Sequence, residues 1–240
     1  MDKKQYDILN KEWVRETKFG RWFLQSDTWV RYVLDVAIKD LSKILGPQPA
    51  AIDKMLDAGC GQGLAFPLLE QSWNPNKIVG IDIDAELLEL AEDSAKKCRC
   101  DVTLKHAKIS ESGHQDDYFD MIFCHQLLHH TSGQTQALKE FYRILAPGGI
   151  LLIGESCRTF INTLPVRLLF KHPADAQKTA SEFVDLVKEN GFSINDEDIK
   201  TSTPWWSLSD LGFLKKIGVN TTQGEPTEVL IVARKPTPST

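Results

Sequence analysis

Apolar residues occur along the chain in two patterns: short continuous runs, and repeats at intervals of three to four residues. Continuous runs predict strands that are buried on both faces of a sheet. Residues 150–154 are the clearest run, and residues 229–233 form another near the end of the sequence. The predicted strands are residues 52–56, 77–82, 102–106, 118–123 and 150–154, then one after residue 192 and one at 229–233.

The helical pattern is clearest in residues 30–45, where charged residues occupy the face opposite the apolar positions. Ser26 or Asp27 is a suitable N-cap, and Gly46 with Pro47 ends the helix. Strands that alternate with helices indicate an α/β protein. Further helices are predicted after residue 63, after residue 84, at 134–145 and at 176–190.

The composition of the 240 residues limits the classes of protein that fit. The length suits one α/β domain with appendages. Lysine and arginine number 28 against 33 acidic residues, a net charge of −5, which argues against a nucleic-acid partner. No apolar run reaches membrane-spanning length, and the charged, tryptophan-containing start is unlike a signal peptide. We therefore expect a cytoplasmic protein with neither a membrane nor a nucleic-acid partner.

The cysteines are five in number and fall mostly in or beside predicted core elements (Cys60, Cys98, Cys100, Cys124 and Cys157). Cys98 and Cys100 lack the spacing of a metal-binding pair, and no second pair completes a zinc site. The expectation is reduced thiols and no metal site.

Residues 57–63, with the sequence DAGCGQG, lie between a predicted strand and a predicted helix. Glycines let the backbone approach a ligand closely, and the following helix points its free N–H groups at that ligand. The spacing G-x-G-x-G differs from the G-x-G-x-x-G of dinucleotide-binding proteins, and no Gly-Lys-Ser/Thr ending of a phosphate loop is present. Asp82 ends the next strand about 20 residues further on, where an acid suits ribose hydroxyls.

Four segments in this order resemble motifs of the class I S-adenosylmethionine-dependent methyltransferases: residues 56–63, 80–82, 118–122 and 143–149. The resemblance covers about residues 50–155. It implies a seven-stranded, doubly wound, Rossmann-like sheet with an antiparallel last strand, and S-adenosylmethionine as the cofactor. It also implies an N-terminal helical cap at 1–48, a cofactor-binding core at 49–155, and lid insertions with the last two strands at 156–240.

One position departs from the family's pattern of cofactor contacts. Where an aspartate usually accepts a hydrogen bond from the adenine amino group, this sequence has Lys108, and an ammonium group only donates. The backbone at Lys108 and Ile109, or the Ser110 hydroxyl, are the alternatives. The residues expected to bind the cofactor are Asp57, Ala58, Gly59, Gly61, Gly63, Asp82, Ile83, Lys108, Ile109 and His125.

Three histidines lie at or after the end of the fourth predicted strand. His125 is at the carboxyl end, where ligands bind in open α/β sheets, and is expected near the methionine part of the cofactor. His129 or His130 could accept a proton from a substrate near neutral pH. A histidine pair is common here in the family whatever the substrate. A structural or solvent-facing role for each therefore stays open beside a catalytic one.

Residues that follow the predicted strand at 150–154, or lie near the chain's beginning and end, are candidates for a substrate pocket. Residues 159–172 are rich in large apolar side chains and are expected to form a lid. Adjacent residues of a strand point to opposite faces, so one of the neighbouring residues Trp205 and Trp206 should reach a surface or a cavity wall. The alternatives are a lid that only packs on the sheet, or a dimer face. The candidate substrate residues are Trp22, Glu155, Arg158, Trp205 and Trp206.

The resemblance implies an enzyme that transfers a methyl group from S-adenosylmethionine to a small, hydrophobic acceptor, with an O-, N- or C-nucleophile left open. A small molecule is the expected partner, and the chain is expected to be a monomer or a homodimer. The alternative is a regulatory protein that binds S-adenosylmethionine or S-adenosylhomocysteine without catalysis. A nicotinamide dehydrogenase is disfavoured by the glycine spacing and by the lack of a Tyr-x-x-x-Lys pair.

Overall fold

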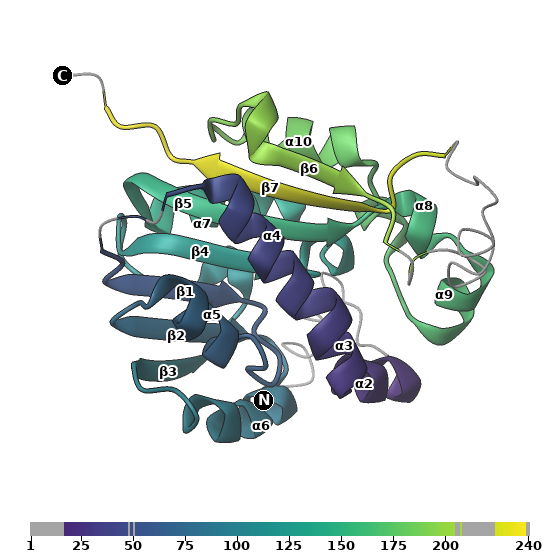
Figure 1. Cartoon of the computed structure of the whole chain (residues 1–240), viewed down its shortest axis with the longest axis horizontal. Coiled ribbons are helices and arrows are strands. Elements are labelled where there is room, and N and C mark those ends of the chain that lie inside the picture. The colour runs from purple at the N-terminus through teal and green to yellow at the C-terminus, as the bar shows by residue number, and fades with distance from the viewer. Residues whose placement is uncertain (1–16, 48, 50, 205–206, 208–223, 239–240) are drawn as a thin grey trace.

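The computed structural model describes residues 17–47, 49, 51–204, 207 and 224–238. Its strands are β1 (Lys54–Ala58), β2 (Lys77–Asp82), β3 (Asp101–His106), β4 (Phe119–His125), β5 (Leu145–Ser156), β6 (Ile199–Ser202) and β7 (Glu228–Arg234). They form a seven-stranded sheet with the order β3-β2-β1-β4-β5-β7-β6. β7 pairs antiparallel with β5 and β6, and the other pairings are parallel. The predicted sheet with an antiparallel last strand is confirmed (Figure 1).

The helices cover both faces of the sheet. They are α2 (Lys18–Leu24), α3 (Asp27–Trp29), α4 (Asp35–Leu45), α5 (Phe66–Trp73), α6 (Ala85–Ala95), α7 (Gln134–Ile144), α8 (Arg158–Ile161), α9 (Leu164–Leu169) and α10 (Ala180–Glu189). One apolar core lies under α4, α5 and α6, and the other under α7 and α10. Met55 and Leu56, neighbours in β1, belong to different cores, as the alternation of side chains along a strand requires. Figure 1 shows α4 lying across the front of the sheet.

The helix predicted at residues 30–45 is present but is not a uniform α-helix. Ser26 is its N-cap, and its hydroxyl oxygen accepts a hydrogen bond from the N–H of Trp29 at 3.2 Å. After α3 the backbone forms a π-helical stretch, η1 (Val30–Leu34), and then continues as α4. A pattern of apolar spacing does not reveal such a stretch. π-Helical turns inside α-helices are frequent at functional sites.

Several strands extend beyond their predicted ends, and two of them, β1 and β4, bear on the site. β1 continues to Ala58, because this residue still pairs with Ile81 of β2. β4 continues to His125, which still pairs with β5. Both strands therefore carry residues of the predicted site at their carboxyl ends.

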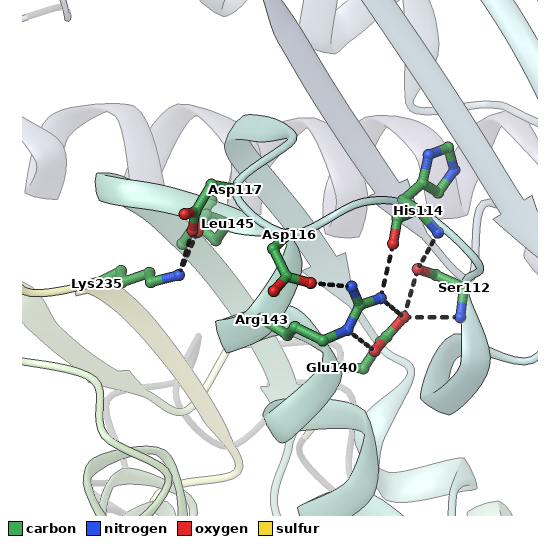
Figure 2. A network of polar contacts seen from close by, with 8 residues as sticks. All are labelled: Ser112, His114, Asp116, Asp117, Glu140, Arg143, Leu145 and Lys235. Carbon is green, nitrogen blue, oxygen red and sulfur yellow. Dashed lines mark hydrogen bonds and ion pairs between the residues drawn. The ribbon is translucent and has the colours of Figure 1, made fainter.

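A polar network ties the loop after β3 to α7 (Figure 2). Glu140 of α7 accepts hydrogen bonds from the backbone N–H and the hydroxyl of Ser112, at 3.0 and 2.6 Å. Arg143 donates to Glu140 and Asp116, and to the carbonyl oxygen of His114. Charge-assisted hydrogen bonds of this kind are stronger than those between neutral groups. The network therefore fixes the loop that contains the positions predicted to meet adenine.

The sheet reverses its strand order between β1 and β4, since the chain runs outward from β1 to β3 and then returns to the other side of β1. In open α/β sheets, ligands bind outside the carboxyl ends of the strands at such a point. β6 and β7 complete this same sheet, and the division of the chain at residues 48 and 155 stays a prediction. Over the ranges given above, no helix combines the length and apolar character needed to pass through a membrane.

Candidate functional site

A cavity of about 740 Å³ opens at the carboxyl ends of β1, β2 and β4. This volume lies within the range of small-molecule sites, about 300–1,000 Å³. One side of the cavity is formed by the glycine turn after β1 and the polar ends of β2 and β4. The other side is formed by apolar side chains from α2, from η1 and from residues 160–170. A polar half and an apolar half thus share one cavity.

The glycine turn is held against β2 by its own backbone. The N–H groups of Gly59 and Cys60 donate to the carbonyl oxygen of Ile81 at 2.8 and 3.0 Å. Gly59, Gly61 and Gly63 have positive φ angles of 71°, 53° and 71°. Residues with a Cβ rarely adopt this conformation. The spacing of the glycines is therefore what the turn requires.

Asp82 joins the end of β2 to this turn. Its carboxylate accepts hydrogen bonds from the N–H groups of Gly61 and Asp84, both at 2.8 Å. Burial raises the pKa of Asp82, and these N–H groups oppose the rise because they stabilise the charged form. The carboxylate also lines the cavity, so it is held in place there before any ligand binds.

Asp57 lines the cavity but is only 3% exposed. Its Oδ2 has no hydrogen-bond partner among the residues that the structure describes. Burial raises the pKa of this carboxyl to about 8, and the nearby charge of Asp82 adds to the rise. A buried polar oxygen without a partner is unfavourable, and a ligand that brings a donor or a positive charge removes that cost. The position therefore suits a cationic group.

His125 forms part of the cavity wall between β4 and η1. Its ring stacks on Phe123, with centroids 5.7 Å apart, and lies 5.8 Å from the ring of Trp29. Burial lowers its pKa to about 3, so the ring is neutral. A Cβ on Gly154 would stand 2.7 Å from the ring's Cδ2, so this place on β5 needs a glycine.

Glu155, at the end of β5, holds the loop that carries His129. Its Oε1 accepts hydrogen bonds from the N–H groups of Leu127 and Leu128 at 3.0 and 2.8 Å. Its Oε2 lies 2.5 Å from Nδ1 of His129. A carboxylate at Nδ1 accepts a hydrogen bond from that nitrogen, which leaves Nε2 as the ring nitrogen available to another group. Glu155 is fully buried and does not line the cavity, so its proposed role changes from contacting substrate to positioning His129.

His130 and His172 complete a cluster with His129 in the cavity wall. The ring centroids are 4.3 Å apart for His129 and His130, and 4.6 Å apart for His130 and His172. The centroids of His129 and His172 are 5.1 Å apart. His129 and His130 belong to the turn η3 (Leu128–His130), and His172 comes from the segment after α9. Two distant parts of the chain therefore meet at this cluster.

Aromatic rings from α2 and from the end of α9 meet at the apolar half of the cavity. Phe19 and Phe23 lie 6.2 and 6.0 Å from Phe170, in each case edge to face. The Thr17 hydroxyl also donates to the carbonyl oxygen of Leu169. We call the three phenylalanines the aromatic contact. All three line the cavity.

Half of the residues predicted to bind cofactor line the cavity, namely Asp57, Gly59, Gly61, Asp82 and His125. The other half, Ala58, Gly63, Ile83, Lys108 and Ile109, do not line it. Gly63 is needed for packing, because a Cβ there would stand 2.4 Å from the Phe66 ring.

None of the described residues predicted to contact substrate lines the cavity. Trp22 is 63% exposed and is not part of the cavity lining, although its neighbours Phe19 and Phe23 are. Arg158 lies at the surface, 3.5 Å from Glu182. Trp205 and Trp206 lie outside the described residues.

Comparison with known proteins identifies a methyltransferase domain within the chain. Residues 56–153 match the family described as a methyltransferase domain. The chain is 30% identical over 154 residues to 27-O-demethylrifamycin SV methyltransferase of Amycolatopsis mediterranei (strain S699), covering 62% of this chain and 54% of that protein. It is 27% identical over 143 residues to phosphoethanolamine N-methyltransferase 1 of Zea mays, covering 60% of this chain and 25% of that protein. The chain thus spans between a quarter and about half of these relatives.

The fold is also shared with an S-adenosylmethionine dependent methyltransferase from Mesorhizobium loti, with a TM-score of 0.61 and 15% identity over 83% of this chain and 98% of that one. Residues 56–153 are a methyltransferase domain, and the fold is that of an S-adenosylmethionine-dependent methyltransferase. This confirms the family expected from the four motifs, and S-adenosylmethionine is the cofactor that belongs to it.

The residues of this methyltransferase domain fit that cofactor. S-adenosylmethionine carries positive charge on its sulfur and on its amino group, and the buried Oδ2 of Asp57 is suited to a positive charge. Asp82, fixed by two backbone N–H groups, presents a carboxylate suited to ribose hydroxyls. The glycine turn leaves room for a close approach of the backbone, since a Cβ on Gly61 would meet nothing within 4 Å.

Replacing Asp57 with asparagine should abolish the proton release that accompanies cofactor binding. The raised pKa, about 8, means that the carboxyl holds its proton in the cofactor-free methyltransferase domain at about pH 6.5. A cation beside it favours the carboxylate, so binding expels the proton and affinity increases as the pH rises toward about 8. Calorimetry with S-adenosylhomocysteine, in two buffers of different ionisation enthalpy, measures the released proton.

The ligand's own ionisable groups titrate in the same way with the unchanged protein and with the asparagine variant. The difference between the two proteins therefore isolates Asp57. Equal proton release by the unchanged protein and the variant would show that the Asp57 carboxyl does not contact the cofactor. The folded, cofactor-free protein binds the Asp57 proton more tightly than the unfolded chain does, because the pKa is raised in the fold. Its stability should therefore fall as the pH rises from about 4 toward 8, and the variant should lack this dependence.

Some lining residues were not singled out from the sequence. Trp29 and Tyr32 project from the segment around η1, and their spacing of three residues was a readable signal of a shared helix face. Gln126 is held in a left-handed conformation, with φ of 54°, and accepts a hydrogen bond from the Ser156 hydroxyl at 2.7 Å. His172 gave no local signal, because its partners are more than forty residues away in the sequence.

Proposed function

We propose that the protein transfers a methyl group from S-adenosylmethionine to a small, largely apolar molecule. The observation that carries this proposal is the two-sided cavity. Asp57 and Asp82 lie on the side of the glycine turn, and the aromatic contact lies on the other side. A cofactor on the polar side would therefore face an acceptor on the apolar side.

The charges around the cavity support a weakly polar acceptor. Among the described lining residues, Arg21 is the one lysine or arginine, and it pairs with Glu86 at 3.2 Å. A phosphate on the acceptor would call for several cationic donors. The phosphoethanolamine in the name of the maize relative is therefore a poor guide to the acceptor of this chain.

The chain's own contribution to the reaction is alignment, exclusion of water and removal of a proton. The cofactor supplies a methyl group that is already activated by its positive sulfur. Apolar side chains of α2, η1 and α9 keep water from the acceptor's half of the cavity. Of the two histidines predicted as catalytic, His129 has a carboxylate at Nδ1, so its Nε2 is the one prepared to accept a proton. We therefore assign the base role to His129 in preference to His130.

The test is label transfer with the purified full chain. S-adenosylmethionine labelled in its methyl group is offered with a panel of acceptors graded in polarity, including phenols, hydrophobic alcohols and amines, with phosphoethanolamine as the polar comparator. We expect label in weakly polar members and none in phosphoethanolamine. Tight binding of S-adenosylhomocysteine without label transfer to any acceptor would favour the regulatory alternative.

A further inference from the structure

The cluster of His129, His130 and His172 places three nitrogen donors together. One ring nitrogen of each histidine lies within 4.8 Å of those of the other two. His129 is buried, and the other two are half-buried in the same wall. The turn η3 and the segment after α9 have to meet for this arrangement to form. An apolar wall alone would need none of these polar rings.

The groups behind the rings are the second observation. Glu155, itself fully buried, contacts Nδ1 of His129 and so turns Nε2 toward the cluster. His130 has a hydrogen bond to the backbone of Lys171. Histidines that bind metals almost always donate their second ring nitrogen to a carboxylate or a backbone carbonyl, which fixes the ring and its tautomer. Two of the three rings already have such a support.

We propose that His129, His130 and His172 bind one divalent transition-metal ion, with Zn²⁺ as the best fit. Imidazole nitrogens suit zinc, copper, nickel and iron more than magnesium or calcium. Three protein ligands and one open position are typical of catalytic zinc sites, whereas structural sites use four protein ligands. The open position here faces the cavity, because all three histidines line it.

The distances allow the site to close around an ion. Zinc–nitrogen bonds of about 2.0–2.1 Å place tetrahedral ligands about 3.3 Å from one another. The present separations, up to 4.8 Å, therefore have to shorten. His172 lies between the end of α9 and the next short turn, in a segment without helix or strand. Movement of that segment or rotation of its side chain shortens these distances without disturbing the sheet.

The chemical role of the ion rests on the proposed function. A metal ion lowers the pKa of a hydroxyl or thiol bound to it, so the open position suits the reacting heteroatom of an acceptor. His129 would then act as a ligand and not as a base. The ion would stabilise the deprotonated hydroxyl or thiol of the methyl acceptor, and the proton would leave to solvent. The sequence predicted no metal site, because it offered no zinc-like cysteine spacing and the third histidine is remote.

The test uses Co²⁺ as the probe, added to the full chain after removal of bound metal with a chelator. We expect one Co²⁺ per chain, a visible absorption band typical of a low-coordinate nitrogen site, and displacement by one equivalent of Zn²⁺. His172→Ala should weaken Co²⁺ binding about a hundredfold or more. Glu155→Gln should weaken it about 10- to 100-fold, as changes behind metal-binding histidines do.

His106→Ala is the matched control, because His106 is exposed and its ring contacts the carbonyl oxygen of Ile83, away from the cluster. It should bind Co²⁺ as the unchanged chain does. Circular dichroism of His172→Ala should be unchanged, since the residue lies outside helices and strands. Equal Co²⁺ affinity in His172→Ala and the unchanged chain would overturn the proposal, as would the absence of one-to-one binding. Metal binding is measured without cofactor or acceptor, so it fails or succeeds independently of methyl transfer.

Discussion

Replacing His129 with alanine should lower the rate of methyl transfer about a hundredfold or more, the usual effect of removing a proton-transfer group. The affinity for S-adenosylhomocysteine should hardly change, because the residues suited to the cofactor, Asp57 and Asp82, lie on the other side of the cavity. Single-turnover rates with a labelled methyl group, together with calorimetric titration, measure the two quantities separately.

Two further variants show which role His129 has. His172→Ala should lower the rate much less than His129→Ala does if His129 is a base, because it is Glu155 that holds the ring of His129. It should lower the rate as much as His129→Ala does if the histidines hold a metal ion. His106→Ala should have no effect in either case. Full activity of His129→Ala would remove His129 from the reaction altogether.

Replacing Gly63 with alanine should destabilise the fold by about 2–5 kcal/mol. The positive φ of 71° costs a residue with a Cβ about 1–2 kcal/mol. In addition, the new Cβ would stand 2.4 Å from Cε2 of Phe66, and overpacking of a core typically costs about 1–3 kcal/mol. The ring cannot move away, since it is fully buried and a Cβ on Gly80 would meet it as well, at 2.6 Å. Urea unfolding of the cofactor-free chain measures the loss.

Gly61→Ala is the matched control for this substitution. Its φ of 53° is also positive, but a Cβ there meets nothing within 4 Å. It should therefore cost only the conformational part, about 1–2 kcal/mol. Equal destabilisation by the two variants would mean that the ring of Phe66 yields. The clash would then have no part in the choice of glycine at position 63.

The sheet and the glycine turn could be predicted because their signals are local. A short apolar run flanked by glycines, such as residues 150–154, favours a buried strand, and the positive φ angles at Gly59 and Gly61 need glycine. The π-helical stretch at Val30–Leu34 could not be predicted, because one changed hydrogen-bond register leaves the apolar spacing almost intact. The spacing of apolar residues therefore predicts helices and strands more readily than irregular turns within them.

The candidate site was less predictable because side-chain direction and distant contacts decide it. Glu155 was correctly placed at the end of a strand, but its carboxylate turns inward to the loop at residues 127–129. Trp22 was expected at the pocket, yet on α2 it is Phe19 and Phe23 that reach the cavity. His172 joins the histidine cluster only because the chain folds back after α9.

The aromatic contact has a consequence for the timing of turnover. Phe19 and Phe23 come from α2, Phe170 comes from the end of α9, and neither helix contributes to the sheet. Separating these rings leaves the strand pairings and both apolar cores untouched. Substitutions at the three phenylalanines should therefore change the rates of ligand entry and product release. The melting temperature should stay the same. We therefore expect the speed of ligand exchange and the stability of the fold to depend on different residues.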